Sequence, residues 1–287
     1  METFAQAVVS GVLTGTLYAM IGIGLTIVFG VMRIINIAHG EMVMLGMFGA
    51  YWGQTLWKLD PFLSLLVWTP LMFLAGVLVY RLLVRPILGG GELNTLLYTA
   101  GLSLLVANVA LLLWSGDYRT ISLSYGATPL RPLGLSVAAP LAIAFAVALG
   151  LTGALWAFLA RTNLGRAIRA TSQNAEAAVL MGVDVERVAL VTFGLGTALA
   201  GAAGVLLAPS LYLYPTVGEL LIVKCFVVVV LGGLGSVPGA IAGGLLLGVV
   251  ESLGAVYVSA AYKDGIGFAL FLAVLLYRPS GLFGVGR

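Results

Sequence analysis

The chain has 287 residues, of which 61% are hydrophobic and 9% are charged, whereas an average soluble domain carries about 25% charged residues. So little charge cannot cover a water-exposed surface, and the composition therefore predicts a membrane protein. The 39 glycines are interleaved with leucine, valine and alanine, a mixture that is typical of closely packed membrane helices and excludes a disordered low-complexity chain.

Few side chains in this sequence could support chemistry. The single cysteine, Cys225, and the single histidine exclude an internal disulfide and a multi-cysteine metal site, so we expect no metal and no cofactor. Neither a Ser/His/Asp arrangement nor a G-x-x-x-x-G-K-[ST] phosphate loop occurs, and catalysis within the chain is not expected. The net charge of +3 comes from arginines that fall between apolar runs, which does not fit nucleic-acid binding.

Apolar stretches between the charged residues predict the membrane segments, because a transmembrane helix needs about 20 apolar residues. The uncharged stretches are 3–32, 42–57, 61–80, 93–116, 132–160 and 188–218. Shorter helices are expected after them, at about 219–232, 239–258 and 264–277. The predicted fold class is all-α: a polytopic transmembrane helical bundle of about eight or nine segments, forming one domain over residues 1–287. Nine full segments and eight segments plus a re-entrant hairpin both fit this pattern.

The orientation of the bundle follows from lysine and arginine, which are enriched in short cytoplasmic loops. One orientation places these basic residues inside: Arg33, Arg81, Arg85, Arg161, Arg166, Arg169, Arg187, Arg278 and Arg287. It leaves the following outside: Lys58, Arg119, Arg131 and Lys263. The sequence therefore predicts a cytoplasmic C-terminus and a short external N-terminus.

Pairs of glycines four positions apart indicate where helices approach one another closely. These pairs are Gly11/Gly15, Gly49/Gly53, Gly239/Gly243 and Gly244/Gly248. They favour a bundle in which several helices cross with their backbones in contact.

The longest polar segment on the predicted cytoplasmic side, residues 163–182, has the features of a capped surface helix. Asn174 is a suitable N-cap, Glu176 lies in the first turn, and Gly182 can end the helix. Asp184 can then cap the next membrane helix, expected at about 185–208.

An ordinary positive loop would explain the arginines of this segment but not its apolar residues. A loop without a binding partner gives no reason for three consecutive apolar residues, which here are Val179, Leu180 and Met181. We therefore interpret the segment as a docking surface.

Four sequence blocks resemble the permease subunits of branched-chain amino-acid ABC importers, in the shorter of the two permease types. The blocks are Arg33-Ile-Ile-Asn-Ile-Ala-His-Gly-Glu-Met-Val-Met-Leu-Gly46, Gly165-Arg-Ala-Ile-Arg-Ala through Gly182-Val, Thr197-Ala-Leu-Ala-Gly-Ala-Ala-Gly204 and Gly232-Gly-Leu-Gly-Ser-Val-Pro-Gly-Ala240. The resemblance implies a bacterial inner (plasma) membrane protein that works with two cytoplasmic ATPase subunits, a homologous second permease and a periplasmic substrate-binding protein.

The resemblance also implies a function, namely ATP-driven import of branched-chain, hydrophobic amino acids by alternating access. Sister permeases for urea and short amides share the same blocks, and the same machine for those cargoes is the alternative. A self-sufficient channel or secondary transporter is a further alternative, but it has no use for a docking segment. In an importer of this kind, we expect residues 163–182 to be the ATPase-docking element. Its apolar anchor would be Val179, Leu180 and Met181, and its flanking contacts would be Arg166 and Arg169.

Two breaks interrupt the predicted helices, at 32–41 and at 232–239, and transporters often place such breaks on their substrate path. We predict that the breaks face each other, with these residues along the path: Asn36, His39, Glu41, Gly232, Gly233, Gly235 and Ser236. The competing hypothesis is that the glycines only allow helices to pack.

His39 and Glu41 allow two interpretations. They could line a polar passage or sense pH, or His39 could close the turn while Glu41 neutralises a helix N-terminus. The structural interpretation is favoured because an ATP-driven importer needs no proton relay.

Lys224 and Glu251 are expected to form a buried ion pair, because each charge lies within an apolar helix and they fall at similar depths of one helical hairpin. The alternative is that Lys224 extends outward toward Glu219.

Overall fold

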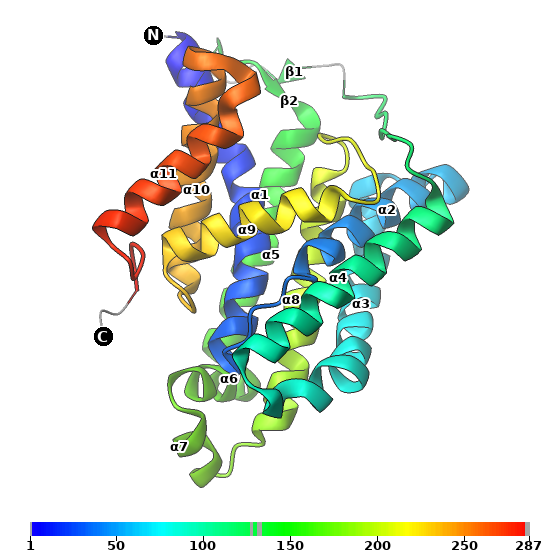
Figure 1. Cartoon of the computed structure of the whole chain (residues 1–287). Helices are drawn as coiled ribbons and strands as arrows, with labels where there is room; N and C mark the ends of the chain where they lie inside the picture. Colours follow the sequence, from blue (N-terminus) through cyan, green and yellow to red (C-terminus); the bar gives the residue numbers. More distant parts are fainter. Residues whose placement is uncertain (1, 127–128, 131–133, 285–287) are drawn as a thin grey trace.

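The computed structural model describes residues 2–126, 129–130 and 134–284, so Arg131 and Arg287 of the orientation argument lie outside the described residues. The described part confirms the all-α class (Figure 1), and its only strands are β1 (Pro129–Leu130) and β2 (Val137–Ala138), which pair antiparallel. The helices are α1 (Glu2–Met32), α2 (His39–Trp57), α3 (Pro61–Val79), α4 (Glu92–Trp114), α5 (Ala139–Arg161), α6 (Asn163–Gln173), α7 (Ala175–Leu180), α8 (Val185–Leu207), α9 (Val217–Gly232), α10 (Val237–Gly254) and α11 (Lys263–Tyr277).

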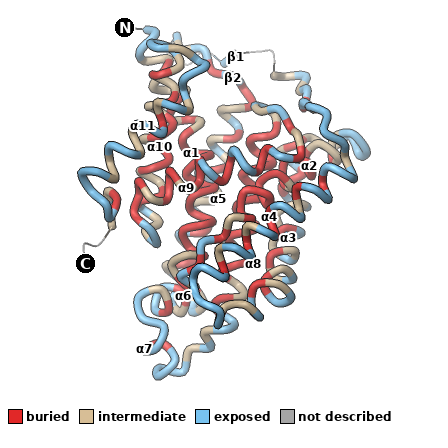
Figure 2. The backbone as a smooth tube through the Cα atoms, in the orientation of Figure 1, coloured by how far each residue is buried: buried red, intermediate tan, exposed pale blue. Residues whose placement is uncertain are grey.

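Helices α1 and α8 form the centre of the bundle. In each of them 83% of the most apolar stretch is buried, against 22% for the stretch that contains α3, 28% for α4 and 17% for α5. Figure 2 shows the buried backbone concentrated in this centre and the exposed backbone around it. A helix that is apolar on all sides belongs in a core or in lipid, so α3, α4 and α5 present apolar faces outward to lipid or to another subunit.

Glycines allow α1 and α10 to cross with their backbones in contact. A methyl group added to Gly11 would lie 2.6 Å from Cα of Val249, and one added to Gly15 would lie 2.6 Å from the carbonyl oxygen of Gly244. Gly248 lies against Gly11 and Gly15 from the other side. The predicted close contacts at Gly11/Gly15 and Gly244/Gly248 are therefore confirmed.

Six helical stretches in the described chain are long and apolar enough to cross a membrane. Helix α2 is not among them and carries polar His39, Glu41 and Gln54, while α9 has only 16 residues. The stretch from Val237 to Tyr277 counts as one because a π-helical turn, η4 (Ala255–Ser259), and a 3-10 turn, η5 (Ala260–Tyr262), join α10 to α11. The backbone at Ser259 is nevertheless extended (φ −173°, ψ 142°), so α10 and α11 are separated by a turn a few residues before the break that the sequence predicted at about 262–265.

The two ends of the bundle are built from different segments. At one end the start of α1 contacts the strand hairpin, since Ser136 donates a backbone hydrogen bond of 2.8 Å to Gln6, and Arg119 pairs with Leu213 of the loop after α8. The other end holds α6 and α7, which project beyond the bundle in Figure 1.

Residues 163–182 form two helices where the sequence predicted one. Asn174 caps α7 by accepting a 3.0 Å hydrogen bond from the backbone N–H of Ala177, and Asp184 caps α8 in the same way through Arg187, so both predicted caps are confirmed. The preceding helix α6 was missed, although Thr162 caps it through Gly165 and its buried positions Gly165, Ile168 and Thr171 recur every three residues.

Replacing Gly15 by alanine is expected to destabilise the protein by about 1–3 kcal/mol, because the added methyl group has backbone on the opposite side and cannot fit without separating α1 from α10. Gly150 on α5 has no atom within 4 Å of an added methyl group, so Gly150→Ala is the matched control and should change stability by less than about 1 kcal/mol. Thermal unfolding of the purified protein in detergent compares the two. Equal midpoints would contradict the proposed backbone contact.

Candidate functional sites

The segment between α1 and α2 folds back along α1. Nε2 of His39 lies 3.2 Å from the carbonyl oxygen of Ile21, and Ile21 is about 16 Å from the end of α1 at Met32. Thr99 of α4 holds the segment by donating to Ile35 and accepting from the backbone N–H of Ile37. Helix α2 therefore begins beside the middle of α1.

Glu41 is completely buried at the meeting point of three helices. Its Oε1 accepts a 3.1 Å hydrogen bond from Ser103 of α4. A methyl group added to Gly218 would lie 2.5 Å from Oε2 of Glu41, so the carboxylate packs directly against this glycine. Glu41 lies in the first turn of α2 and against the first turn of α9. The carboxylate thus lies beside two helix N-termini, where an acidic residue is favoured, and this agrees with the structural interpretation of this residue.

The second break is a tight turn between α9 and α10. Gly233 and Gly235 have φ values of 101° and 84°, which favour glycine. Ser236 caps α10 by accepting a 3.1 Å hydrogen bond from the N–H of Gly239. Residues near the C-terminus cover the turn, since the N–H of Phe283 donates to the carbonyl of Gly232.

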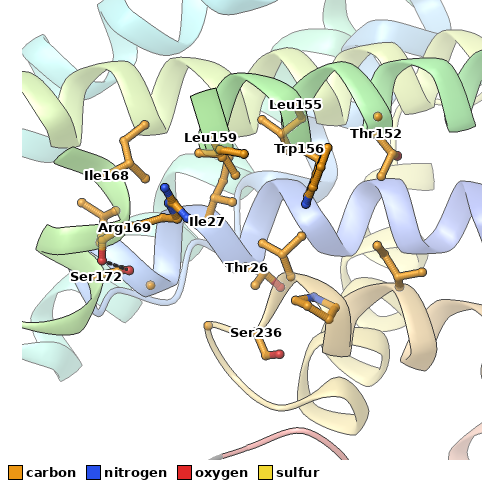
Figure 3. Close-up of a pocket in the computed structure, with 18 of the residues that line it drawn as sticks. Thr26, Ile27, Thr152, Leu155, Trp156, Leu159, Ile168, Arg169, Ser172 and Ser236 are labelled. Carbon is orange, nitrogen blue, oxygen red and sulfur yellow. Dashed lines mark hydrogen bonds between the residues drawn. The ribbon is translucent and has the colours of Figure 1, made fainter. Parts of the chain in front are cut away.

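A cavity of about 720 Å³ lies between α1, α5, α6 and the start of α10. In Figure 3, Leu155, Trp156 and Leu159 of α5 lie on one side of α1, and Ser236 lies on the other. Arg169 of α6 extends toward the space between α1 and α5. The walls are mainly apolar, with hydroxyl groups and one guanidinium among them.

The structure brings only part of the predicted path together. Gly235 and Ser236 line the cavity, and Gly235 faces Gly30 at the end of α1. The remaining predicted path residues do not line it: Asn36, His39, Glu41, Gly232 and Gly233. The first break, which contains Asn36, His39 and Glu41, packs against α4, α9 and the middle of α1. In the second break, Gly232 packs against the backbone of Gly239.

The exposed tip of α7 carries the apolar residues that the sequence singled out. Leu180 and Met181 are 87% and 83% exposed, and Val179 is 57% exposed. On the preceding helix, Arg166 donates a hydrogen bond to Asn163, whereas Arg169 lines the cavity. The two arginines therefore serve different surfaces.

Lys224 lies between two carboxylates. Its Nζ is 2.5 Å from Oε1 of Glu251 and 2.7 Å from Oδ1 of Asp264, and it lies 5.0 Å from the centre of the Tyr18 ring. Within the described chain, these two carboxylates account for all the ion pairs of Lys224, and Glu219 is not among them. The network joins α1, α9, α10 and α11.

Sequence reasoning missed two parts of these sites. No partner was predicted for Asp264, and only the turn between α10 and α11 brings it to Lys224. The cavity face of α5 was also missed. Its spacing carried a signal, since five of the seven lining residues of α5 recur at helical spacing: Leu149, Thr152, Gly153, Trp156 and Leu159.

Comparison with known proteins assigns the family. Residues 7–275 match the family model described as "Branched-chain amino acid transport system / permease component". The chain belongs to this family. It is a multi-pass membrane permease and a transport subunit, not an enzyme.

Full-length relatives agree with this assignment. The permease is 35% identical to the high-affinity branched-chain amino acid transport system permease protein BraD of Pseudomonas aeruginosa, over 98% of this chain and 96% of the relative. It is 34% identical to the LivH permease protein of Escherichia coli K12, with the same coverage, and 30% identical to a probable LivH of Methanocaldococcus jannaschii, over 96% and 90%. No solved structure matches the permease.

Replacing Lys224 by methionine is expected to destabilise the permease by about 3–5 kcal/mol, because two carboxylates then lose their buried cation. Adding Glu251→Gln should recover part of this loss by removing one uncompensated charge. Thermal unfolding in detergent measures both variants, and Lys58→Met, at an exposed position, is the control. An unchanged midpoint for Lys224→Met would show that the network contributes no stability.

Proposed function

We propose that this permease imports branched-chain, hydrophobic amino acids by alternating access, driven by ATP hydrolysis on two cytoplasmic ATPase subunits. The observation that carries the proposal is the exposed apolar tip of α7. Helix α7 projects beyond the bundle (Figure 1), and three consecutive apolar side chains at its tip are exposed. A permease that worked alone would have no partner to cover them.

The proposed docking surface consists of Val179, Leu180 and Met181, with Arg166 of the preceding helix α6 as its flanking cation. An exposed apolar cluster flanked by a cation is typical of a protein interface, in which an apolar centre is surrounded by polar groups. Asn174 caps α7 itself and Asp184 caps the following helix α8, which keeps α7 in place relative to the membrane helices.

The arginine-rich end is proposed to be cytoplasmic, which places the C-terminus inside and the permease in a bacterial inner membrane. Among the described residues, the basic groups at the ends of α1 and α5 and on α6 belong to this end: Arg33, Arg161, Arg166 and Arg169. Lys58 and Arg119 belong to the opposite end. This distribution follows the enrichment of basic residues in cytoplasmic loops.

We also propose that α2 and α9 lie within the membrane, which brings the bundle to eight or nine segments with two broken helices. Both helices pack against the centre of the bundle, and Glu41 is enclosed by protein at the point where α2 begins, with Ser103 donating to its Oε1. Non-helical backbone at this depth is tolerated when it is enclosed by protein. The apolar outer faces of α3 to α5 leave room for a homologous second permease, and the strand-hairpin end faces a periplasmic binding protein.

The cargo follows from the relatives, whose names specify branched-chain amino acids. Vesicles containing the permease, its second permease and the ATPase subunits should take up leucine, isoleucine and valine when ATP and the loaded binding protein are supplied. Urea and acetamide are the comparison cargoes. Uptake of urea or acetamide in preference to leucine would replace the proposed cargo.

Replacing Leu180 by aspartate should abolish ATP-driven uptake, because a charge at the centre of an apolar interface costs about 2 kcal/mol or more of binding. The permease itself should fold normally, since Leu180 is 87% exposed. Co-purification of the ATPase subunits measures docking directly. Leu130→Asp, at an exposed position on the strand hairpin at the opposite end, is the matched control and should retain the ATPase subunits. Normal docking by Leu180→Asp would refute the proposed interface.

A further inference from the structure

We propose that the cavity between α1, α5, α6 and α10 binds the cargo amino acid on its way to the cytoplasm, with Arg169 as the group that binds its carboxylate. This inference rests on the proposed function and extends it to a binding site and a specificity-determining residue. It assigns Arg169 to the substrate path, whereas the sequence placed it at the ATPase interface.

The guanidinium of Arg169 is the available cation of this cavity. Among the described residues it takes part in no ion pair and its side chain has no hydrogen bond. Two other arginines at the same end are engaged, since Arg85 pairs with Glu186 at 2.8 Å and Arg166 donates to Asn163. A planar guanidinium can bind a carboxylate through two parallel hydrogen bonds.

Hydroxyl groups line the cavity near the loop before α10. Oγ1 of Thr26 is completely buried and has no hydrogen-bond partner in the described structure. Figure 3 shows Thr26 facing the loop that carries Ser236. A buried hydroxyl without a partner costs free energy, and the ammonium group of an amino acid would satisfy it.

The remaining wall suits an aliphatic side chain. Ile27 of α1, Leu155 and Leu159 of α5, and Ile168 of α6 surround the space with apolar groups. A cationic or strongly polar side chain would lose its hydration there without gaining a partner. The volume of about 720 Å³ also lies within the range of roughly 300–1,000 Å³ that is common for small-molecule sites.

The position of α6 links this site to the docking surface. Helix α6 carries Arg169 and ends at Gln173, and α7 begins at Ala175, so one residue separates the two helices. A displacement of α7 by the ATPase would therefore be transmitted to α6, and with it to the carboxylate-binding group.

Protection of an introduced cysteine from a water-soluble maleimide tests this site in the assembled importer. Thr152→Cys and Ser172→Cys place reporters in the cavity wall on two different helices, and the native Cys225 is buried. Leucine at increasing concentration should slow labelling at both positions, whereas urea should not. Lys58→Cys, an exposed position at the opposite end of the bundle and outside both the cavity and the docking surface, is the control and should be labelled at the same rate with and without leucine.

Two arginine variants then test the specific role of Arg169. Arg169→Gln should raise the leucine concentration needed for protection by roughly 10- to 100-fold, as expected for the loss of a hydrogen-bonded charge pair. Arg161→Gln, at the exposed end of α5 and outside both the cavity lining and the docking surface, should leave it unchanged. ATPase co-purification shows that both variants assemble.

The outcomes separate this inference from the proposed function. Leucine uptake without protection at either reporter would overturn the cavity as the binding site and leave the proposed function standing. If Arg169→Gln and the protein with both arginines intact need the same leucine concentration for protection, the role of Arg169 is overturned. An equal loss of protection in both arginine variants would overturn it as well. Protection by urea together with uptake of urea would overturn the proposed cargo itself.

Discussion

Helices in a bilayer gain little from burying apolar surface against one another, because lipid tails are also apolar, so close packing must hold them together. In this permease that packing depends on glycines along α1. Gly11 and Gly15 allow α10 to approach, and Gly24 faces Gly196 of α8, where an added methyl group would lie 2.8 Å from a carbonyl oxygen. The three helices form the centre against which α2, α5, α6 and α9 are positioned, and the cavity lies along the surface of α1.

Two buried charged groups are stabilised in different ways. Glu41 has no cationic partner within the described residues and lies at the N-termini of α2 and α9, with Ser103 as its donor. Lys224 has two carboxylate partners, one buried and one 39% exposed. Both arrangements connect helices that are distant in sequence, so each charge specifies how α9 is placed. A purely apolar helix of 16 residues could slide along its neighbours, whereas charged contacts at two positions define its register.

The cavity and the docking surface are adjacent but chemically distinct. The cavity is lined by apolar groups, hydroxyls and a free guanidinium, whereas the tip of α7 is apolar and exposed. Helix α6 belongs to both, because Ile168 and Arg169 face the cavity and Gln173 leads into α7. This arrangement allows the group that holds the cargo to respond to a movement of the ATPase without a long chain of intermediates.

The sequence by itself determined the properties that depend on local composition and spacing. Low charge and long apolar stretches specified a membrane bundle, the small-residue pairs marked the α1–α10 crossing, and Asn174 and Asp184 marked helix starts, because each signal involves residues a few positions apart. The tertiary structure alone decided which distant groups meet. It brought Asp264 to Lys224, placed Glu41 against Gly218, and distinguished Arg169, which lines the cavity, from Arg166 one turn earlier, which bonds to Asn163. These contacts depend on the crossing and depth of whole helices, which no short stretch of sequence specifies.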